Sequence, residues 1–364
     1  MNYNEIRRRT PKTKIGNKYI GGDSPIAIQS MTNTDTHDKE ATLAQIRALE
    51  LAGCDIVRIT VPDIEAADTI VYLKENGVGI PIVADIHFDY KIALRCAELG
   101  VDKIRINPGN IGSNEKVKAV SNACRAHNIP IRIGINSGSL QRDILEKYGS
   151  PTPEALCESA FRHIGLLEKY DFDNIVVSIK ASNVPSMIKT NRLLAERCSY
   201  PIHLGVTEAG SENIGTLKSA IGVGSLLCDG IGDTIRVSLT ADPVLEIDAA
   251  RKILKSVEIE GQSGLKIVSC PTCGRTKIDL ISLVSRFEDA VKREGLEDFP
   301  IKVAIMGCVV NGPGEAREAD IGVAGGIGEG LLFSRGKIID KLPEERIIEA
   351  LIEKIKEIKK TNKR

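Results

Sequence analysis

The 364-residue sequence contains no tryptophan, and aromatic residues make up only 4% of it. Its cores must therefore be built from aliphatic side chains. The sequence also lacks a net charge, with 49 Lys and Arg residues against 49 Asp and Glu residues. This balance disfavours a nucleic-acid-binding protein or a polybasic membrane-surface protein. No stretch approaches the roughly 20 apolar residues of a membrane span, and no apolar secretory segment is visible near the N-terminus. We therefore expect a cytoplasmic globular protein.

Cysteine is present in an odd number, nine residues, in a chain with no visible export signal. A disulfide framework is therefore disfavoured, and metal binding or redox chemistry by some of the cysteines is the better expectation. Six cysteines are solitary, and we expect them to pack as small apolar side chains. These six are Cys54, Cys96, Cys124, Cys157, Cys198 and Cys228.

Eight short segments rich in Ile and Val recur along the first two thirds of the chain, most of them followed by apolar residues at helical spacing. The segments begin at Pro25, Asp55, Pro81, Lys103, Pro130, Asn174, Pro201 and Asp233. Segments that are apolar on both faces are typical of buried parallel strands. Eight strand–helix units predict a (β/α)8 TIM barrel. The alternative is an open doubly wound sheet, but no GxGxxG motif follows the first strand.

A polar, glycine-containing stretch after the eighth predicted helix indicates a domain boundary. We expect a TIM barrel over residues 1–258 and a small α+β domain over residues 265–364. The pattern of the second domain predicts a strand, an amphipathic helix, two further strands, a hairpin and a closing charged helix. Before the first barrel strand, residues 13–25 predict a small hairpin that could cap the barrel floor.

The other three cysteines fall in the second predicted domain. Cys270 and Cys273 form a C-x-x-C pair at the end of a strand, and Cys308 ends another strand, seven residues before Glu315. Three thiolates can hold one metal centre. This domain has no fourth cysteine and no histidine, which disfavours a zinc site with four N or S ligands; zinc and a dithiol redox pair both remain open. An iron–sulfur cluster fits best, with Glu315 as the resting occupant of a labile position that can bind substrate as a Lewis acid.

Polar residues recur near the carboxyl ends of the predicted barrel strands, where the active sites of TIM barrels lie. Five of the eight strands place a cation there, namely Arg58, Arg105, Arg132, Lys180 and Arg236. Other polar residues at these ends are Asp85, His87, Asn136, Glu208 and Ser238. Buried charges are costly unless they are paired, so either acids on neighbouring strands pair with the cations or the cations bind an anion. Several convergent guanidinium groups suit a phosphate or diphosphate.

Five segments together resemble a known family. They are CPTCGR at 270–275, MGCVVNGPGEA at 306–316, ADIHFD at 84–89, RINPGNIG at 105–112 and GVTEAG at 205–210. The chain resembles the 4-hydroxy-3-methylbut-2-enyl diphosphate synthases, the iron–sulfur enzymes of the non-mevalonate isoprenoid pathway, over roughly residues 9–341. Its length matches the two-domain bacterial form.

The resemblance implies a [4Fe–4S] cluster held by Cys270, Cys273, Cys308 and Glu315. It implies 2-C-methyl-D-erythritol 2,4-cyclodiphosphate as the substrate. The residues that it implies in substrate binding are Arg58, Arg105, Arg132, Asn136, Lys180, Arg236 and Ser238, and we expect His87, from one of the family's motifs, to bind the substrate as well. It implies Glu208 as the barrel carboxylate that faces the substrate and Glu315 as a second catalytic carboxylate. The implied reaction is reductive ring opening and dehydroxylation in two one-electron steps, with flavodoxin or ferredoxin as donor, in a head-to-tail homodimer.

Two other functions remain open on the residues alone. One is a metal-dependent lyase or aldolase that acts on a phosphosugar and carries a structural zinc in its small domain. The other is an iron–sulfur electron carrier that uses the barrel as a docking surface. A carrier has no need of five cations at one barrel rim, which counts against it.

Overall fold

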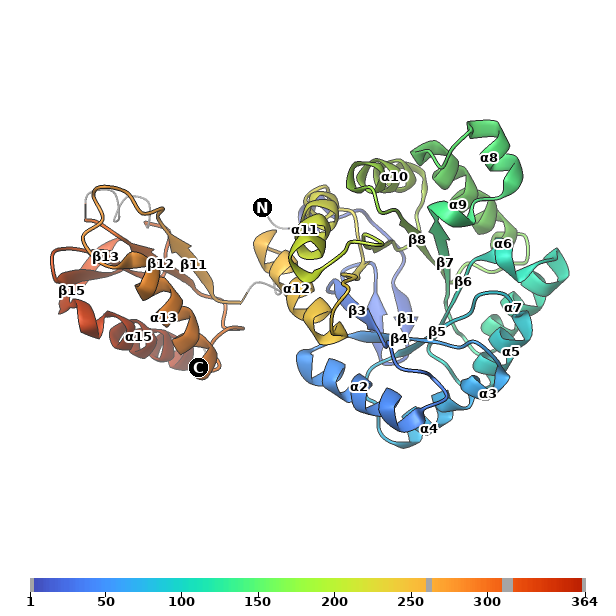
Figure 1. Ribbon diagram of the computed structural model, residues 1–364, viewed down its shortest axis with the longest axis horizontal. Coiled ribbons are helices and arrows are strands. Elements are labelled where there is room, and N and C mark those ends of the chain that lie inside the picture. The colour runs from blue at the N-terminus through green and yellow to red at the C-terminus, as the bar shows by residue number, and fades with distance from the viewer. Residues whose placement is uncertain (1–2, 260–263, 310–316, 362–364) are drawn as a thin grey trace. The chain divides into compact units, whose positions relative to one another are not determined.

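The computed structural model describes residues 3–259, 264–309 and 317–361. The chain divides into two compact units, residues 1–260 and 261–364, and Figure 1 draws both of them. Among the described residues, no helix combines the length and the apolar character needed to cross a membrane.

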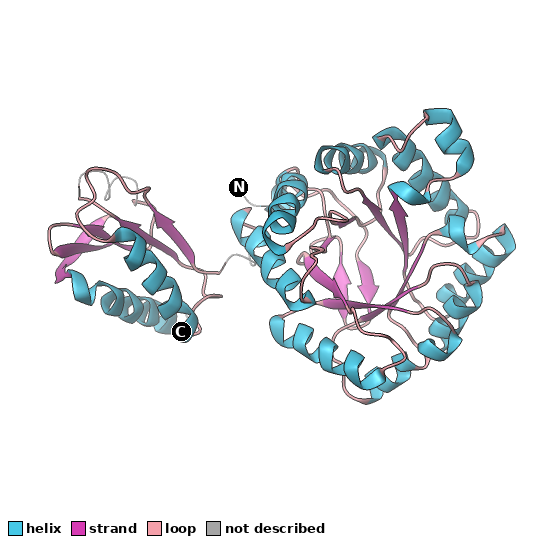
Figure 2. Ribbon diagram, viewed as in Figure 1, coloured by secondary structure: helices cyan, strands magenta, loops and turns pink. Residues whose placement is uncertain are grey.

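The first unit is a barrel of eight parallel strands surrounded by helices, as Figure 2 shows, and it confirms the predicted (β/α)8 fold. Its strands are β3 (Ala27–Met31), β4 (Ile56–Thr60), β5 (Ile82–Asp85), β6 (Lys103–Ile106), β7 (Ile131–Asn136), β8 (Ile175–Lys180), β9 (His203–Leu204) and β10 (Thr234–Ile235). The strands pair in the order β8-β7-β6-β5-β4-β3-β10-β9. A parallel bridge between Val177 and Ile202 brings β8 to the segment that leads into β9, so the barrel is nearly closed.

Apart from α1, which precedes the strands, the helices of this unit follow the barrel strands, with one or two helices after each strand. They are α1 (Tyr3–Ile6), α2 (Lys39–Ala52), α3 (Ile64–Ala67), α4 (Thr69–Glu75), α5 (Tyr90–Glu98), α6 (Pro108–Ile111), α7 (Asn114–Ala126), α8 (Arg142–Tyr148), α9 (Pro153–Glu168), α10 (Val184–Arg197), α11 (Glu212–Cys228) and α12 (Pro243–Ser256). The ends of these helices are set by capping residues in the local sequence. Helix α2, for example, begins after Asp38, whose carboxylate accepts from the Ala41 N–H, and ends at Gly53 with φ of +87°, a left-handed conformation that glycine adopts without strain.

Aliphatic side chains from the strands and helices form the main core of the barrel, as the shortage of aromatics predicts. A separate small cluster closes the amino-terminal end of the barrel. The predicted hairpin is present as β1 (Thr13–Ile15) paired with β2 (Lys18–Ile20), and it contributes two fully buried isoleucines to this cluster. The cluster consists of Ile15, Ile20, Ala27, Ile56, Val83 and Val176. It fills the floor of the barrel with apolar groups.

The second unit is a five-stranded mixed sheet, in the order β11-β12-β13-β14-β15, with two long helices. Its elements are β11 (Lys266–Ser269), α13 (Leu280–Arg293), β12 (Lys302–Met306), β13 (Ile321–Gly325), β14 (Glu329–Ser334), β15 (Lys337–Pro343) and α15 (Ile347–Thr361). Strands β11, β12 and β13 are parallel, whereas β14 and β15 complete the sheet as an antiparallel hairpin. Helices α13 and α15 bury their apolar faces, including Phe287 and Leu351, against strand residues such as Val303 and Val323. This is the small α+β fold that the sequence predicts.

Candidate active site

A cavity of about 270 Å³ lies at the carboxyl ends of the barrel strands. Its lining includes all eight substrate-binding residues expected from the sequence, namely Arg58, His87, Arg105, Arg132, Asn136, Lys180, Arg236 and Ser238. The rest of the lining consists of Met31, Thr60, Asp85, Gly134, Ser178 and Thr207. Side chains alternate along a strand, so every second residue of a barrel strand points inward. The cavity therefore gathers residues that are far apart in the sequence.

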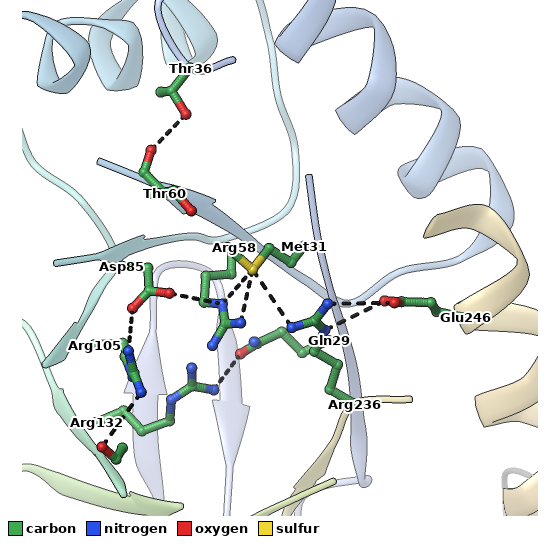
Figure 3. Close-up of polar contacts among 11 residues, drawn as sticks. Gln29, Met31, Thr36, Arg58, Thr60, Asp85, Arg105, Arg132, Arg236 and Glu246 are labelled. Carbon is green, nitrogen blue, oxygen red and sulfur yellow. Dashed lines mark hydrogen bonds and ion pairs between the residues drawn. The ribbon is translucent and has the colours of Figure 1, made fainter. Parts of the chain in front are cut away.

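A small set of partners holds the arginines in place (Figure 3). The Asp85 carboxylate accepts from Nη1 of Arg105 at 2.9 Å, and its other oxygen lies 3.6 Å from Nε of Arg58. The Met31 sulfur accepts from Nε and Nη2 of Arg58 at 3.1 and 2.8 Å. The same sulfur lies 3.6 Å from Nη1 of Arg236. Asp85 thus links Arg58 to Arg105, and the Met31 sulfur links Arg58 to Arg236.

Glu246, on helix α12, holds Arg236 from the side away from Met31. Its Oε1 lies 3.4 Å from Nη2 of Arg236. The carboxylate is itself fixed, because the Ser30 hydroxyl donates to it at 2.8 Å and the Leu239 N–H donates at 3.1 Å. Glu246 is buried, so these bonds satisfy a charge that would otherwise be costly.

Two glycines make room for the cations. A methyl group at Gly134 would collide with the guanidinium of Arg105, which lies across β7 at that point. At Gly205, just after β9, an added methyl would meet the Arg236 carbonyl oxygen at 2.6 Å and the Lys180 ammonium at 2.9 Å. A side chain at either position would displace a cation from the cavity.

Burial strongly perturbs the ionisable groups of the cavity. It lowers the pKa of Lys180 and of Arg132 well below their usual ranges, and neighbouring cations lower both further. Burial also lowers the pKa of Arg58 to about 10, although Asp85 acts in the opposite direction. For Asp85, burial favours a higher pKa, but Arg58 and Arg105 together lower it to about 2. The carboxylate is therefore ionised at neutral pH, and the cations repel one another where water screens them poorly.

The charge balance of the cavity favours an anionic ligand. Among the described residues, five cations and one carboxylate line it, and Glu246 adds one more negative charge beside Arg236. Asp85 and Glu246 thus offset only part of the positive charge. A phosphate or diphosphate can accept several N–H groups at once and relieve the repulsion between the cations. The serine, asparagine and histidine side chains of the lining can bind the uncharged parts of such a ligand.

Glu208, the predicted barrel carboxylate, does not line this cavity. It is an exposed residue in the loop after β9, one position beyond the lining residue Thr207. Its backbone adopts φ of +52°, in the left-handed region that favours glycine. Such a conformation costs about 1 kcal/mol or more for a residue with a side chain, and it sets the direction in which Glu208 leaves the loop. The catalytic role of Glu208 stays a prediction.

The three predicted cluster cysteines fall at one edge of the second unit's sheet. Cys270 follows β11, and Cys308 comes two residues after the parallel neighbour β12. The Gly307 N–H donates to the Cys270 sulfur at 3.3 Å. In the loop after β11, the Thr276 N–H donates to the Cys273 carbonyl at 3.0 Å. The two loops that carry the thiols are therefore neighbours.

These thiols fit an iron–sulfur cluster in kind, because thiolates are its usual ligands. Cys273 is exposed and the other two are half-buried, so all three are accessible. Within the described ranges, no three His, Cys, Asp or Glu side chains are grouped closely enough to hold a metal ion. The fourth expected ligand, Glu315, lies outside the described residues.

The solitary cysteines of the barrel differ from these three. Five are buried, and burial raises the pKa of the thiol, to about 12 at Cys54, Cys96 and Cys124. A protonated, enclosed thiol packs as an apolar group and is a poor ligand. The expectation of core packing is wrong for Cys228, which is exposed at the last turn of α11.

Three residues that organise the cavity were not expected from the sequence. Met31 and Gln29 lie on β3, which reads as an ordinary buried strand. Glu246 had a detectable signal, because it occupies the buried stripe of α12 together with Ala250 and Ile253. An acid on the apolar face of a helix predicts a buried partner of opposite charge.

The fold and the cavity define a TIM-barrel protein whose interior is arranged to bind an anion, joined to a small domain that carries three thiols on two neighbouring loops. Comparison with known proteins is more specific. The chain belongs to the GcpE family, because residues 10–251 match the GcpE TIM-barrel domain and residues 266–357 match the GcpE protein C-terminal domain.

Relatives with known names are similar over almost the whole chain. A protein of Clostridium perfringens is 57% identical, over 97% of this chain and 99% of its own length. One from Ruminiclostridium cellulolyticum is 55% identical, over 97% of this chain and 98% of its own. Both are named 4-hydroxy-3-methylbut-2-en-1-yl diphosphate synthase (flavodoxin). These matches confirm the family resemblance.

Proposed function

We propose that this chain is an oxidoreductase that converts 2-C-methyl-D-erythritol 2,4-cyclodiphosphate into 4-hydroxy-3-methylbut-2-enyl diphosphate in isoprenoid biosynthesis. The observation that carries the proposal is the cavity itself, where five cations converge with only one lining carboxylate among the described residues. The names of relatives more than half identical to this chain support the reaction. In the reaction a ring C–O bond breaks, a hydroxyl group leaves as water, and two electrons enter.

The barrel's part in this reaction is to bind and orient the cyclic diphosphate. Arg58, Arg105, Arg132, Lys180 and Arg236 hold the phosphate oxygens, and this binding stabilises the negative charge that the diphosphate gains when the ring opens. Asn136 and Ser238 hold the hydroxyl groups of the carbon skeleton. Asp85 remains ionised and keeps Arg58 and Arg105 directed toward the ligand. Because Asp85 is already paired with two arginines, it is unsuited to act as a proton donor.

Glu208 is the proposed proton donor or charge stabiliser. It follows Thr207, which lines the cavity, so its backbone lies next to the lining. His87 lines the cavity beside Asp85 and is a second group that can donate a hydrogen bond to the ligand.

We propose that Cys270, Cys273, Cys308 and Glu315 hold a [4Fe–4S] cluster. The three thiols support this because they lie on neighbouring loops and are accessible. When bound, the cluster supplies the two electrons one at a time. Flavodoxin is the proposed donor, since it appears in the names of the relatives. A homodimer and a cytoplasmic location stay predictions.

Anaerobic turnover tests the proposal. Protein reconstituted with iron and sulfide is given the cyclic diphosphate and a one-electron reductant, and the product is identified by mass spectrometry. The proposal predicts the allylic diphosphate, formed only when the reductant is present. A preparation that is colourless, loaded with zinc and inactive under these conditions would contradict it and favour the lyase alternative.

A further inference from the structure

The side chain of Met31, at the end of β3, lies between two arginines of the cavity (Figure 3). Its sulfur is 2.8 Å from Nη2 and 3.1 Å from Nε of Arg58, and 3.6 Å from Nη1 of Arg236. A thioether sulfur accepts hydrogen bonds weakly and carries no charge. It can therefore orient N–H groups without neutralising the cations that bear them.

Carboxylates also lie close to the same two arginines. Asp85 lies 3.6 Å from Nε of Arg58, and Glu246 lies 3.5 and 3.4 Å from Nε and Nη2 of Arg236. The two guanidinium groups thus have different acidic neighbours but share the sulfur. Burial lowers the pKa of Arg58, and the charge of Arg236 lowers it further, so the two groups are close enough to repel each other.

We propose that Met31 is a positioning residue, whose sulfur holds Arg58 and Arg236 at one spacing so that both bind the same phosphate group of the ligand. The kind of side chain at position 31 determines how well the two arginines can bind a phosphate. A carboxylate here would neutralise one cation and compete with the phosphate oxygens for the same N–H groups. An aliphatic side chain would leave those N–H groups without an acceptor in a partly buried site, which is unfavourable.

The test compares three variants by calorimetric titration of the purified protein with inorganic diphosphate. M31L keeps the apolar character and removes the acceptor, and we expect it to weaken diphosphate binding by about tenfold. M31Q is less apolar but restores an acceptor through its amide oxygen, so it should regain most of the lost affinity. M187L is the matched control, because Met187 is buried in the apolar core on α10; it should bind diphosphate as the unmodified protein does.

A residue that only fills space predicts the opposite order, with M31L binding like the unmodified protein and M31Q binding weakly. That order, or equal affinity in all the proteins, would overturn the proposal. If M31L does not fold, the diphosphate affinity of M31Q is the test. A tenfold or greater loss of affinity in M31Q would count against the sulfur's role as an acceptor.

Turnover adds a second readout. KM for the substrate should rise in M31L while kcat changes little, since the sulfur acts on ligand binding and not on electron entry. The kinetic comparison rests on the proposed function, whereas the diphosphate titration does not. Absence of turnover in the unmodified protein would therefore contradict the proposed function and leave the comparison of variants valid.

Discussion

Replacing Arg132 with Met should stabilise the ligand-free protein while it weakens ligand binding. Arg132 is 1% exposed, its Nη1 donates to Gln29 at 3.3 Å, and its Nε has no hydrogen-bond partner in the part of the chain that the structure describes. Replacing poorly paired buried charges with apolar groups of similar size often stabilises a protein by about 1–4 kcal/mol. At about 2–4 °C per kcal/mol for a unit of this size, the Tm should rise by roughly 2–16 °C.

The effect of the same substitution on binding has the opposite sign. A buried cation that pairs with a ligand phosphate is typically worth about 2–5 kcal/mol when it is removed, so diphosphate affinity should fall by about 30-fold or more. Thermal melts and calorimetric titrations on one preparation measure both effects. Arg142→Met is the control, since that side chain is 92% exposed on α8 and should change neither quantity. An Arg132→Met protein that melts lower, or that binds diphosphate as before, would refute the reasoning.

Three further predictions follow from the structure. Asp85→Asn should lower the free energy of unfolding at pH 7 by about 2–3 kcal/mol, because the folded-state pKa of about 2 lies below the ordinary value of 3.8. That stabilisation is present above about pH 4 and is lost as the pH falls toward 2, so urea-unfolding curves of the two proteins should converge in acid; a constant difference would contradict it. Cys273→Ser should abolish the broad absorption near ~400 nm of an iron–sulfur protein, whereas Cys96→Ala, a buried barrel thiol, should retain it. Diphosphate binding should raise the pKa of Lys180, so at alkaline pH the protein should take up protons on binding; titration heats that do not depend on the ionisation enthalpy of the buffer would exclude this.

The barrel could be predicted because each of its strands is short, apolar on both faces and bounded by helical segments. The cations of the cavity could be predicted for a related reason. Arg58, Arg105 and Arg132 each lie between two Ile or Val residues of a strand, and a charge in such a place needs a partner or a ligand. Because the strands are parallel, these arginines lie at the same end of the barrel. Their positions in the sequence alone therefore indicate that they are close together.

The partners of the arginines could not be predicted in the same way. Met31 looks like any core residue, and only the position of the arginines around its sulfur supports the role that we propose for it. Glu246 reaches the cavity from a helix, and the pairing of a helix residue with Arg236 depends on how α12 packs against the strands. The direction of Glu208 depends on a left-handed backbone conformation, which a sequence with glutamate at that position does not indicate.

Electron counting tests the central claim most directly. The unmodified protein, reconstituted anaerobically, is given the cyclic diphosphate and a measured amount of a reduced viologen, and the product is quantified by ³¹P NMR. The account predicts two viologen radicals oxidised for each allylic diphosphate formed, and no product without the reductant. Ring opening that consumes no electrons would contradict it.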